Sequence, residues 1–109
     1  MPVIEITSRA EFYEKILESK DAAILDCYAQ WCPPCKAIAP KLEEWSEHYT
    51  DVKFYKVDVE AVPDVAQELN VTAMPTFMLF KGGEKVTEVV GAQAGVIENG
   101  IKTLLLGKE

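Results

Sequence analysis

Residues 22–29 (AAILDCYA) constrain the fold more than any other segment of the chain. Every second residue of a β-strand points to the same face of its sheet, and here both sets are apolar apart from Asp26. A strand that is apolar on both faces is typical of the centre of a largely parallel sheet, which needs helices packed against each face. The segment therefore predicts an α/β fold with this strand in the middle of the sheet.

Helical and extended segments alternate along the rest of the chain. Ser8 and Glu11 have the spacing of a capping box, which predicts a helix that begins there. Gly82 and Gly83 predict a hairpin turn between two antiparallel strands. This order of elements predicts a mixed sheet with helices on both faces. The predicted elements are a strand at 3–6, this first helix, a strand at 22–29, a helix at 34–49, a strand at 52–58, a short helix from Pro63, strands at 76–80 and 86–90, and a helix at 93–106 that buries Val96, Ile97, Ile101, Leu104 and Leu105.

Size and charge limit what the chain can bind. The 109 residues are enough for one domain with its own hydrophobic core, so we expect a single domain over residues 1–109. A formal charge of −7 opposes binding to nucleic acid and to anionic lipid, and it favours a monomer. No apolar run is long enough to cross a membrane, and the first residues lack the pattern of a secretion signal. We therefore expect a cytoplasmic monomer without nucleic-acid or membrane partners.

The three cysteines are too few, and uneven in number, for a secreted fold held together by disulfides. We expect them to do chemistry in a reducing compartment instead. Cys32 and Cys35 are separated by two residues at the start of the predicted long helix. The N–H groups and partial positive charge of a helix N-terminus favour a thiolate, which makes Cys32 the candidate nucleophile. Cys35, one turn into the helix, should be less exposed and is suited to resolve a mixed disulfide formed at Cys32.

A zinc site is the main alternative interpretation of the Cys32 and Cys35 pair. Such a site needs two more ligands, and the chain offers only Cys27 and His48. Cys27 has the opposite parity to Asp26 in its strand and should be a buried packing residue. His48 is near the end of the long helix, where a cation complements the helix dipole. We therefore expect redox exchange and no metal.

Asp26 is the one charged residue in the predicted central strand. Burial disfavours the ionised form of a lone carboxylate, so the pKa of Asp26 should be raised and the group should accept a proton near neutral pH. The alternative is a carboxylate that pairs with Lys56 for structure alone. The neighbouring Cys-x-x-Cys pair favours the chemical role.

Residues spread along the chain carry a resemblance to a known family. They are Asp26, Trp31-Cys32-x-Pro34-Cys35-Lys36, Pro40, Lys56, Met74-Pro75-Thr76 and Gly91. In this order and spacing they resemble the thioredoxin family, and the resemblance covers essentially the whole chain. The match is nearest to the small single-domain thioredoxins of the eukaryotic cytosol. The resemblance implies a mixed five-stranded sheet with four helices, and a dithiol that reduces disulfides in client proteins without a cofactor. A thioredoxin reductase or a glutathione-linked system would then restore the dithiol.

The resemblance also implies roles for single residues. Cys32 matches the attacking thiol and Cys35 the resolving thiol. Asp26 matches a buried acid below Cys35, and Lys56 is the matching cation.

Two other functions are alternatives to a disulfide reductase. The second hypothesis is a binding module, a subunit or chaperone that holds a partner in the groove around Trp31, Pro75 and Gly91 whatever the redox state. A net oxidase or isomerase is the third.

The surface around the first thiol is expected to bind the client. Pro75 matches a cis-proline that faces the dithiol, and Met74 would offer backbone groups to an extended client segment. Trp31 is predicted to belong to this functional surface, whereas Trp45 lies on the apolar side of the long helix and should be core. The residues expected to bind the client are Trp31, Pro33, Pro34, Val59, Ala73, Met74, Pro75, Gly91 and Ala92.

Pro33 departs from the commonest family motif, which has glycine at this position. Two consecutive prolines remove two N–H groups from the first turn, so the sulfur of Cys32 should have mainly the Cys35 N–H as a donor. Pro34 disfavours helical angles at the residue before it, which predicts that the regular helix begins at Pro34. We expect a stiffer turn and a redox potential that differs from that of a glycine-proline version.

Overall fold

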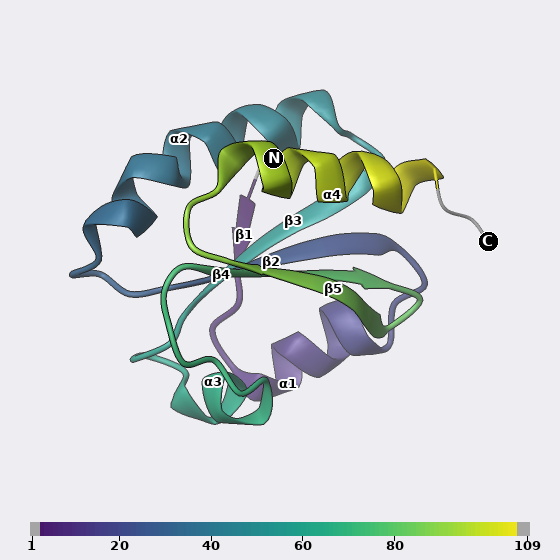
Figure 1. The fold of residues 1–109 in the computed structure, drawn as a ribbon. Coiled ribbons are helices and arrows are strands. Elements are labelled where there is room, and N and C mark those ends of the chain that lie inside the picture. The colour runs from purple at the N-terminus through teal and green to yellow at the C-terminus, as the bar shows by residue number, and fades with distance from the viewer. Residues whose placement is uncertain (1–2, 107–109) are drawn as a thin grey trace.

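The computed structural model describes residues 3–106 and confirms the predicted mixed α/β sheet (Figure 1). The strand order is β1-β3-β2-β4-β5, which places the doubly apolar strand in the middle as predicted. β3 pairs in parallel with both of its neighbours, whereas β4 is antiparallel to β2 and to β5. The expected domain of residues 1–109 extends beyond the described residues at both ends. The strands are β1 (Val3–Glu5), β2 (Ala22–Tyr28), β3 (Val52–Asp58), β4 (Thr76–Lys81) and β5 (Glu84–Val90).

Helices cover both faces of this sheet. Figure 1 shows α2 and α4 against one face and α1 with α3 against the other. The side chain of Ser8 caps α1 by accepting a hydrogen bond from the Glu11 N–H, as the capping-box spacing predicts. None of the helices in residues 3–106 is long and apolar enough to cross a membrane. The helical segments are α1 (Arg9–Phe12), the π-helical turn η1 (Tyr13–Leu17) that continues it, α2 (Pro33–His48), α3 (Pro63–Glu68) and α4 (Ala94–Leu106).

The alternation of side chains along β2 divides the core into two layers. Ile24 belongs to the cluster under α2 and α4, and Leu25 belongs to the cluster under α1 and α3. Asp26 therefore lies on the α2 side of the sheet, and Cys27 lies on the other side, in the second cluster. This separation places one acidic side chain next to the start of α2 and keeps the third cysteine away from it.

The hairpin turn is tighter than predicted. β5 begins at Glu84, two residues before the predicted start, because Gly82 and Gly83 alone make the turn. Both have positive φ values, 61° and 83°, which glycine adopts without steric cost.

The prediction for the inner side of the last helix is wrong at two residues. Ile97, Ile101 and Leu104 are buried against the sheet as predicted, but Val96 is 51% exposed and Leu105 is 37% exposed. The buried residues are spaced four and then three positions apart, so they form one narrow stripe along α4. Val96 and Leu105 are next to this stripe in sequence and lie at its margins, where they stay in contact with solvent.

Candidate active site

The first turn of α2 carries both cysteines of the motif. Cys32 is the N-cap residue, and Pro33 and Pro34 take the first two helical positions. The prediction that the helix begins at Pro34 is wrong, because the ring of Pro33 already fixes φ near the helical value and the first helical residue needs no N–H partner. The first N–H of the turn belongs to Cys35, and it donates to Sγ of Cys32 over 3.2 Å, as predicted.

Cys32 and Cys35 are joined by a disulfide, and their Cα atoms are 5.3 Å apart. The expectation that Cys35 is the less exposed of the two is wrong in this oxidised form, because Cys32 is 2% exposed and Cys35 is 4% exposed. Both pack with Ala29 against side chains from other loops, among them Val59 and Met74. Contacts with these loops therefore bury Cys32 as fully as Cys35.

Replacement of Pro33 by glycine tests what the double proline contributes. Pro33 is the first residue of α2, a position that suits proline. Glycine gives the unfolded chain more conformational entropy to lose on folding, so we expect Pro33→Gly to lower the free energy of unfolding by about 0.5–1 kcal/mol. We also expect its equilibrium with glutathione to differ from that of the parent protein. Denaturant unfolding and redox titration against glutathione measure the two effects, and identical potentials would contradict the predicted role in the redox turn.

Asp26 is buried behind the dithiol. Its side chain borders a cavity of about 120 Å³ that Cys35 and Lys36 also line, together with Lys56 from β3. Asp26 is 4% exposed, and its Oδ1 atom has no hydrogen-bond partner within residues 3–106. Burial raises the pKa of Asp26 to about 7, against the opposing effect of the Lys56 charge. The carboxyl group can therefore exchange a proton at neutral pH within the cavity that contains Cys35.

Lys56 stands opposite Asp26 in the sheet register, yet its ammonium group pairs elsewhere. Within the described residues, the ion pair of Lys56 is made with Glu5 of β1, at 3.9 Å between Nζ and Oε1. The alternative of a structural Asp26–Lys56 pair has no such contact to support it in this part of the chain. Glu5 was not identified from the sequence, because only the strand order places β1 next to β3.

The loop that precedes β4 packs against the two cysteines. The Met74–Pro75 peptide bond is cis, and Met74 packs against the cysteine cluster. The Pro75 carbonyl accepts a hydrogen bond of 2.8 Å from the N–H of Gly91, whose φ is 94°. The hydroxyl of Thr76 donates to the Ala73 carbonyl over 2.6 Å. The first bond joins the loop to the segment after β5, and the second holds the loop internally. Ala73 of the loop and Ala92 after β5 remain exposed.

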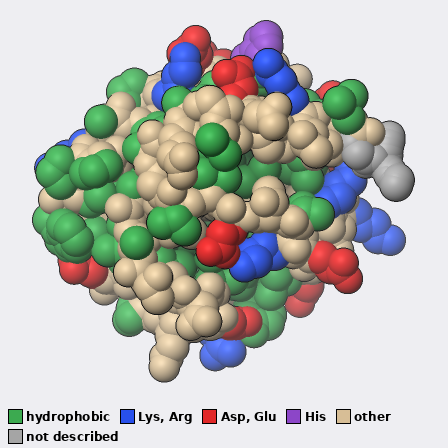
Figure 2. Space-filling view, in the orientation of Figure 1, with side chains coloured by type: hydrophobic (Ala, Val, Ile, Leu, Met, Phe, Trp, Pro, Cys, Tyr) green, Lys and Arg blue, Asp and Glu red, His purple; other side chains and the backbone are tan. Residues whose placement is uncertain are grey.

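Trp31 lies on the surface beside Cys32. Its side chain is 59% exposed, and Nε1 donates to Oε2 of Glu60 over 2.8 Å. Pro33 and Pro34 are also exposed, whereas Trp45 is 3% exposed and belongs to the core, as predicted. Hydrophobic side chains gather at the left edge of the face in Figure 2, the end where Figure 1 places the beginning of α2. An apolar surface thus surrounds the dithiol.

Cys27 and His48 are separate from this site. Cys27 is a free thiol with no exposed surface, and burial raises its pKa strongly. It fills the core on the α1 and α3 side, as predicted. His48 is exposed in the last turn of α2. No group of three His, Cys, Asp or Glu residues within the described range could hold a metal ion.

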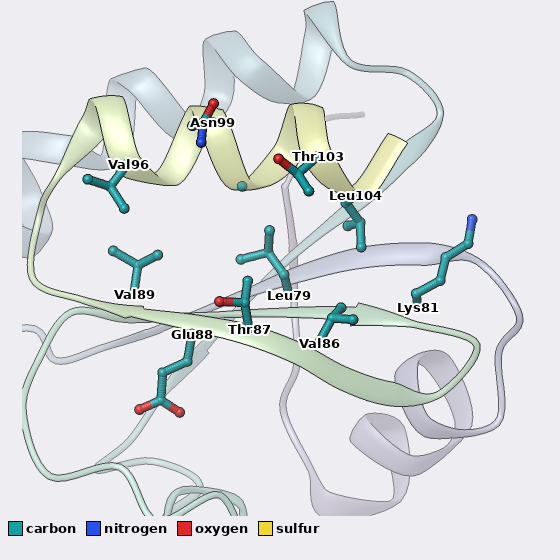
Figure 3. A pocket seen from close by; sticks show the side chains of 11 residues that line it. Leu79, Lys81, Val86, Thr87, Glu88, Val89, Val96, Asn99, Thr103 and Leu104 are labelled. Carbon is teal, nitrogen blue, oxygen red and sulfur yellow. The ribbon is translucent and has the colours of Figure 1, made fainter. Parts of the chain in front are cut away.

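A larger hollow of about 470 Å³ lies away from the dithiol, between α4 and the hairpin of β4 and β5 (Figure 3). Val96 of α4 and Val89 of β5 face one another across it, whereas the side chain of Glu88 points away from α4. Leu79 and Gly100 are also among the lining residues. The hollow contains none of the predicted site residues, so its size alone does not make it the active site.

The fold and the disulfide at the start of α2 together define a thiol-disulfide oxidoreductase. The disulfide lies beside the loop that contains the cis-proline, and an apolar surface surrounds it. The chain belongs to the thioredoxin family, and the family's model, described as thioredoxin, matches residues 3–103.

Relatives and solved structures agree with this assignment. Thioredoxin-2 of Pyricularia oryzae is 54% identical over 92 residues, which cover 84% of this chain and 53% of that relative. Thioredoxin Asp f 29 of Aspergillus fumigatus is 49% identical over 102 residues, which cover 92% of this chain and 93% of the relative. The oxidised structure of mitochondrial thioredoxin 3 from Saccharomyces cerevisiae superposes with a TM-score of 0.87 at 41% identity, over 92% of this chain and 93% of that one. The protein is accordingly a protein-disulfide oxidoreductase that acts on disulfide-containing substrates and works with a reductase.

Proposed function

We propose that the protein is a monomeric, single-domain thioredoxin of the cytoplasm, which receives electrons from an NADPH-dependent thioredoxin reductase. The sequence supports this proposal through a net charge of −7 and through its resemblance to the small single-domain thioredoxins. A cytoplasmic protein of this kind keeps its dithiol reduced and passes two electrons to each client disulfide. The glutathione-linked system is the competing electron donor.

The reaction begins at Cys32. Its thiolate, favoured by the Cys35 N–H and by the N-terminus of α2, attacks one sulfur of the client disulfide. A Cys32–client bond forms, the client disulfide breaks, and the second client sulfur leaves as a thiolate that takes a proton from water. Trp31 and the backbone of Met74 hold the client segment during this step. The exposed Pro33, Pro34, Ala73 and Ala92 and the partly buried Val59 and Gly91 surround the segment, and the buried Pro75 lies beneath them.

The second step needs a thiolate at Cys35, and Asp26 is the base that removes the proton from this thiol. The thiol of Cys35 gives its proton to the Asp26 carboxylate across the shared cavity, directly or through water. The Cys35 thiolate then attacks Sγ of Cys32, the bond between the two cysteines forms, and the Cys32–client bond breaks. The client sulfur leaves as a thiolate. The observation that supports this role most directly is the buried carboxyl of Asp26, whose pKa of about 7 lets it take up and release a proton at neutral pH.

Insulin reduction with two electron donors tests this proposal. The protein is assayed with NADPH and thioredoxin reductase, and in parallel with glutathione, glutathione reductase and glutaredoxin. We expect turnover with thioredoxin reductase to exceed turnover with the glutathione system at least about tenfold, because a specific reductase contacts the surface around Cys32. The Cys32→Ser variant supplies the background rate. Activity with only the glutathione system would contradict the proposed electron donor.

A further inference from the structure

Lys56 lies between two carboxylates on the α2 side of the sheet. Glu5 of β1 is the register partner of Lys56 in β3, and Lys56 is the register partner of Asp26 in β2. Register partners on neighbouring strands point to the same face, so the three side chains form one row across the sheet. Glu5 and Asp26 therefore compete for a single ammonium group.

The contacts in this row favour Glu5. The Nζ atom of Lys56 is 3.9 Å from Oε1 of Glu5, and it lies 5.9 Å from the ring centre of Tyr28. The Tyr28 hydroxyl donates to both carboxylate oxygens of Glu5, over 3.0 and 2.9 Å. Tyr28 thus fixes the carboxylate that holds Lys56. By contrast, Oδ1 of Asp26 has no hydrogen-bond partner in the described part of the chain.

This group of side chains connects to the cavity behind the dithiol. Tyr28, Lys56 and Asp26 all line that cavity, and Cys35 lines it from α2. A change in the position of the Lys56 charge therefore acts on the carboxyl that faces the resolving thiol. The charged and titratable groups around Asp26 are Glu5 of β1, Tyr28 of β2, Lys56 and Asp58 of β3, and Cys35 and Lys36 of α2, while its partner on β4 is the apolar Phe77.

We propose that Glu5 is a positioning residue of the redox site, which holds the Lys56 ammonium group on the β1 side and so sets the pH at which Asp26 can take the Cys35 proton. This inference rests on the role of Asp26 in the proposed function. Glu5 contacts neither sulfur and acts through Lys56 and through its own charge. The Lys56 charge lowers the pKa of Asp26 and the Glu5 charge raises it, so both actions of Glu5 have the same direction.

Glu5→Gln is the sharpest variant, because it removes the charge and keeps an oxygen that can accept the Tyr28 hydrogen bond. We expect the pKa of Asp26 to fall, since the direct repulsion is lost and Lys56 is free to approach. Glu5 and Asp26 are two strand spacings apart, about 10 Å, where two unit charges change a proton-binding constant about two- to fivefold near a protein surface. The ionised fraction of Asp26 at pH 6 should therefore rise about two- to fourfold.

Carbon-13 NMR titration of the Asp26 carboxyl carbon in the oxidised protein measures this effect directly. The matched control is Glu84→Gln, which removes the same charge from an exposed residue on β5, at the opposite edge of the sheet. We expect the titration of Asp26 to move to lower pH in Glu5→Gln and to stay in place in Glu84→Gln. An unchanged titration in Glu5→Gln, or an equal change in both variants, overturns the inference.

A double-mutant cycle tests whether Glu5 acts through Lys56. Lys56→Gln should move the titration of Asp26 to higher pH, because the favourable charge is lost. In the Lys56→Gln background, the effect of Glu5→Gln should shrink to the direct repulsion alone. An effect of undiminished size in that background would show that Glu5 does not position Lys56, which would overturn that part of the inference.

The kinetic consequence is measured separately. The rate at which Cys35 releases a client from Cys32 is followed against pH in the parent protein, in Glu5→Gln and in Asp26→Asn. We expect the acid limb of the profile to move to lower pH in Glu5→Gln and to disappear in Asp26→Asn. If Asp26→Asn keeps the parent profile, the proposed role of Asp26 is wrong, and the carboxyl titration alone then decides whether Glu5 controls Asp26.

Discussion

Asp26→Asn is expected to raise the free energy of unfolding of the oxidised protein by about 4 kcal/mol at pH 9. The reason is the cost of burying a carboxylate. The pKa of Asp26 is about 7 in the folded protein, against an ordinary value of 3.8 in an unfolded chain. A neutral amide of the same shape does not incur the cost of ionisation.

The sign of this effect fixes its pH dependence. Folding raises the pKa of this carboxyl group, so its contribution to the free energy of unfolding is fully present below pH 3.8. That contribution is lost as the pH rises through about 7, where the group ionises in the folded protein. At about pH 3.5 the parent and Asp26→Asn should therefore be equally stable. The difference between their free energies of unfolding should grow up to neutral pH and level off above it.

Guanidinium unfolding of the oxidised proteins at acidic and alkaline pH provides the measurement. Asp21→Asn, at an exposed aspartate just before β2, is the matched control and should change the stability at neither pH. A difference between parent and Asp26→Asn that does not depend on pH would contradict the raised pKa.

Cys32→Ser is expected to reduce insulin reduction by at least about 100-fold, to the rate without the protein, because a hydroxyl cannot form the mixed disulfide. Cys27→Ala is the matched control. Its thiol is fully buried on the opposite side of the sheet, so it should keep the parent's activity and lose only stability through a small cavity. Comparable losses in both variants would mean that cysteine loss acts through folding rather than through chemistry.

The centre of the fold could be predicted because one strand carries a strong signal. A segment that is apolar on both faces belongs in the middle of a sheet, and its single carboxylate must then be buried. The burial of Asp26 and Cys27 follows from that strand, and the place of Cys32 and Cys35 at a helix N-terminus follows from the motif after it, although the first helical residue was predicted one position too late. Each of these predictions depends on residues that are close together in the sequence.

The remaining features depend on contacts between distant segments. Glu5 joins the site only because β1 pairs with β3, which brings it beside Lys56, 51 positions further along the chain. The burial of Cys32 depends on Val59 and Met74, which come from separate loops. Hydrophobic periodicity places Val96 near the inner side of α4, but it does not show the hollow between α4 and β5 that leaves this side chain exposed, so this residue was wrongly predicted as buried.

Trapping of a client on the Cys35→Ser variant tests the central claim most directly. The reduced variant is mixed with insulin, quenched with acid and analysed by mass spectrometry after digestion under non-reducing conditions. Because the resolving thiol is absent, we expect one insulin chain to remain joined to the Cys32 peptide until a reductant is added. No adduct, or an adduct at Cys27, would contradict the assignment of Cys32 as the attacking thiol and Cys35 as the resolving one.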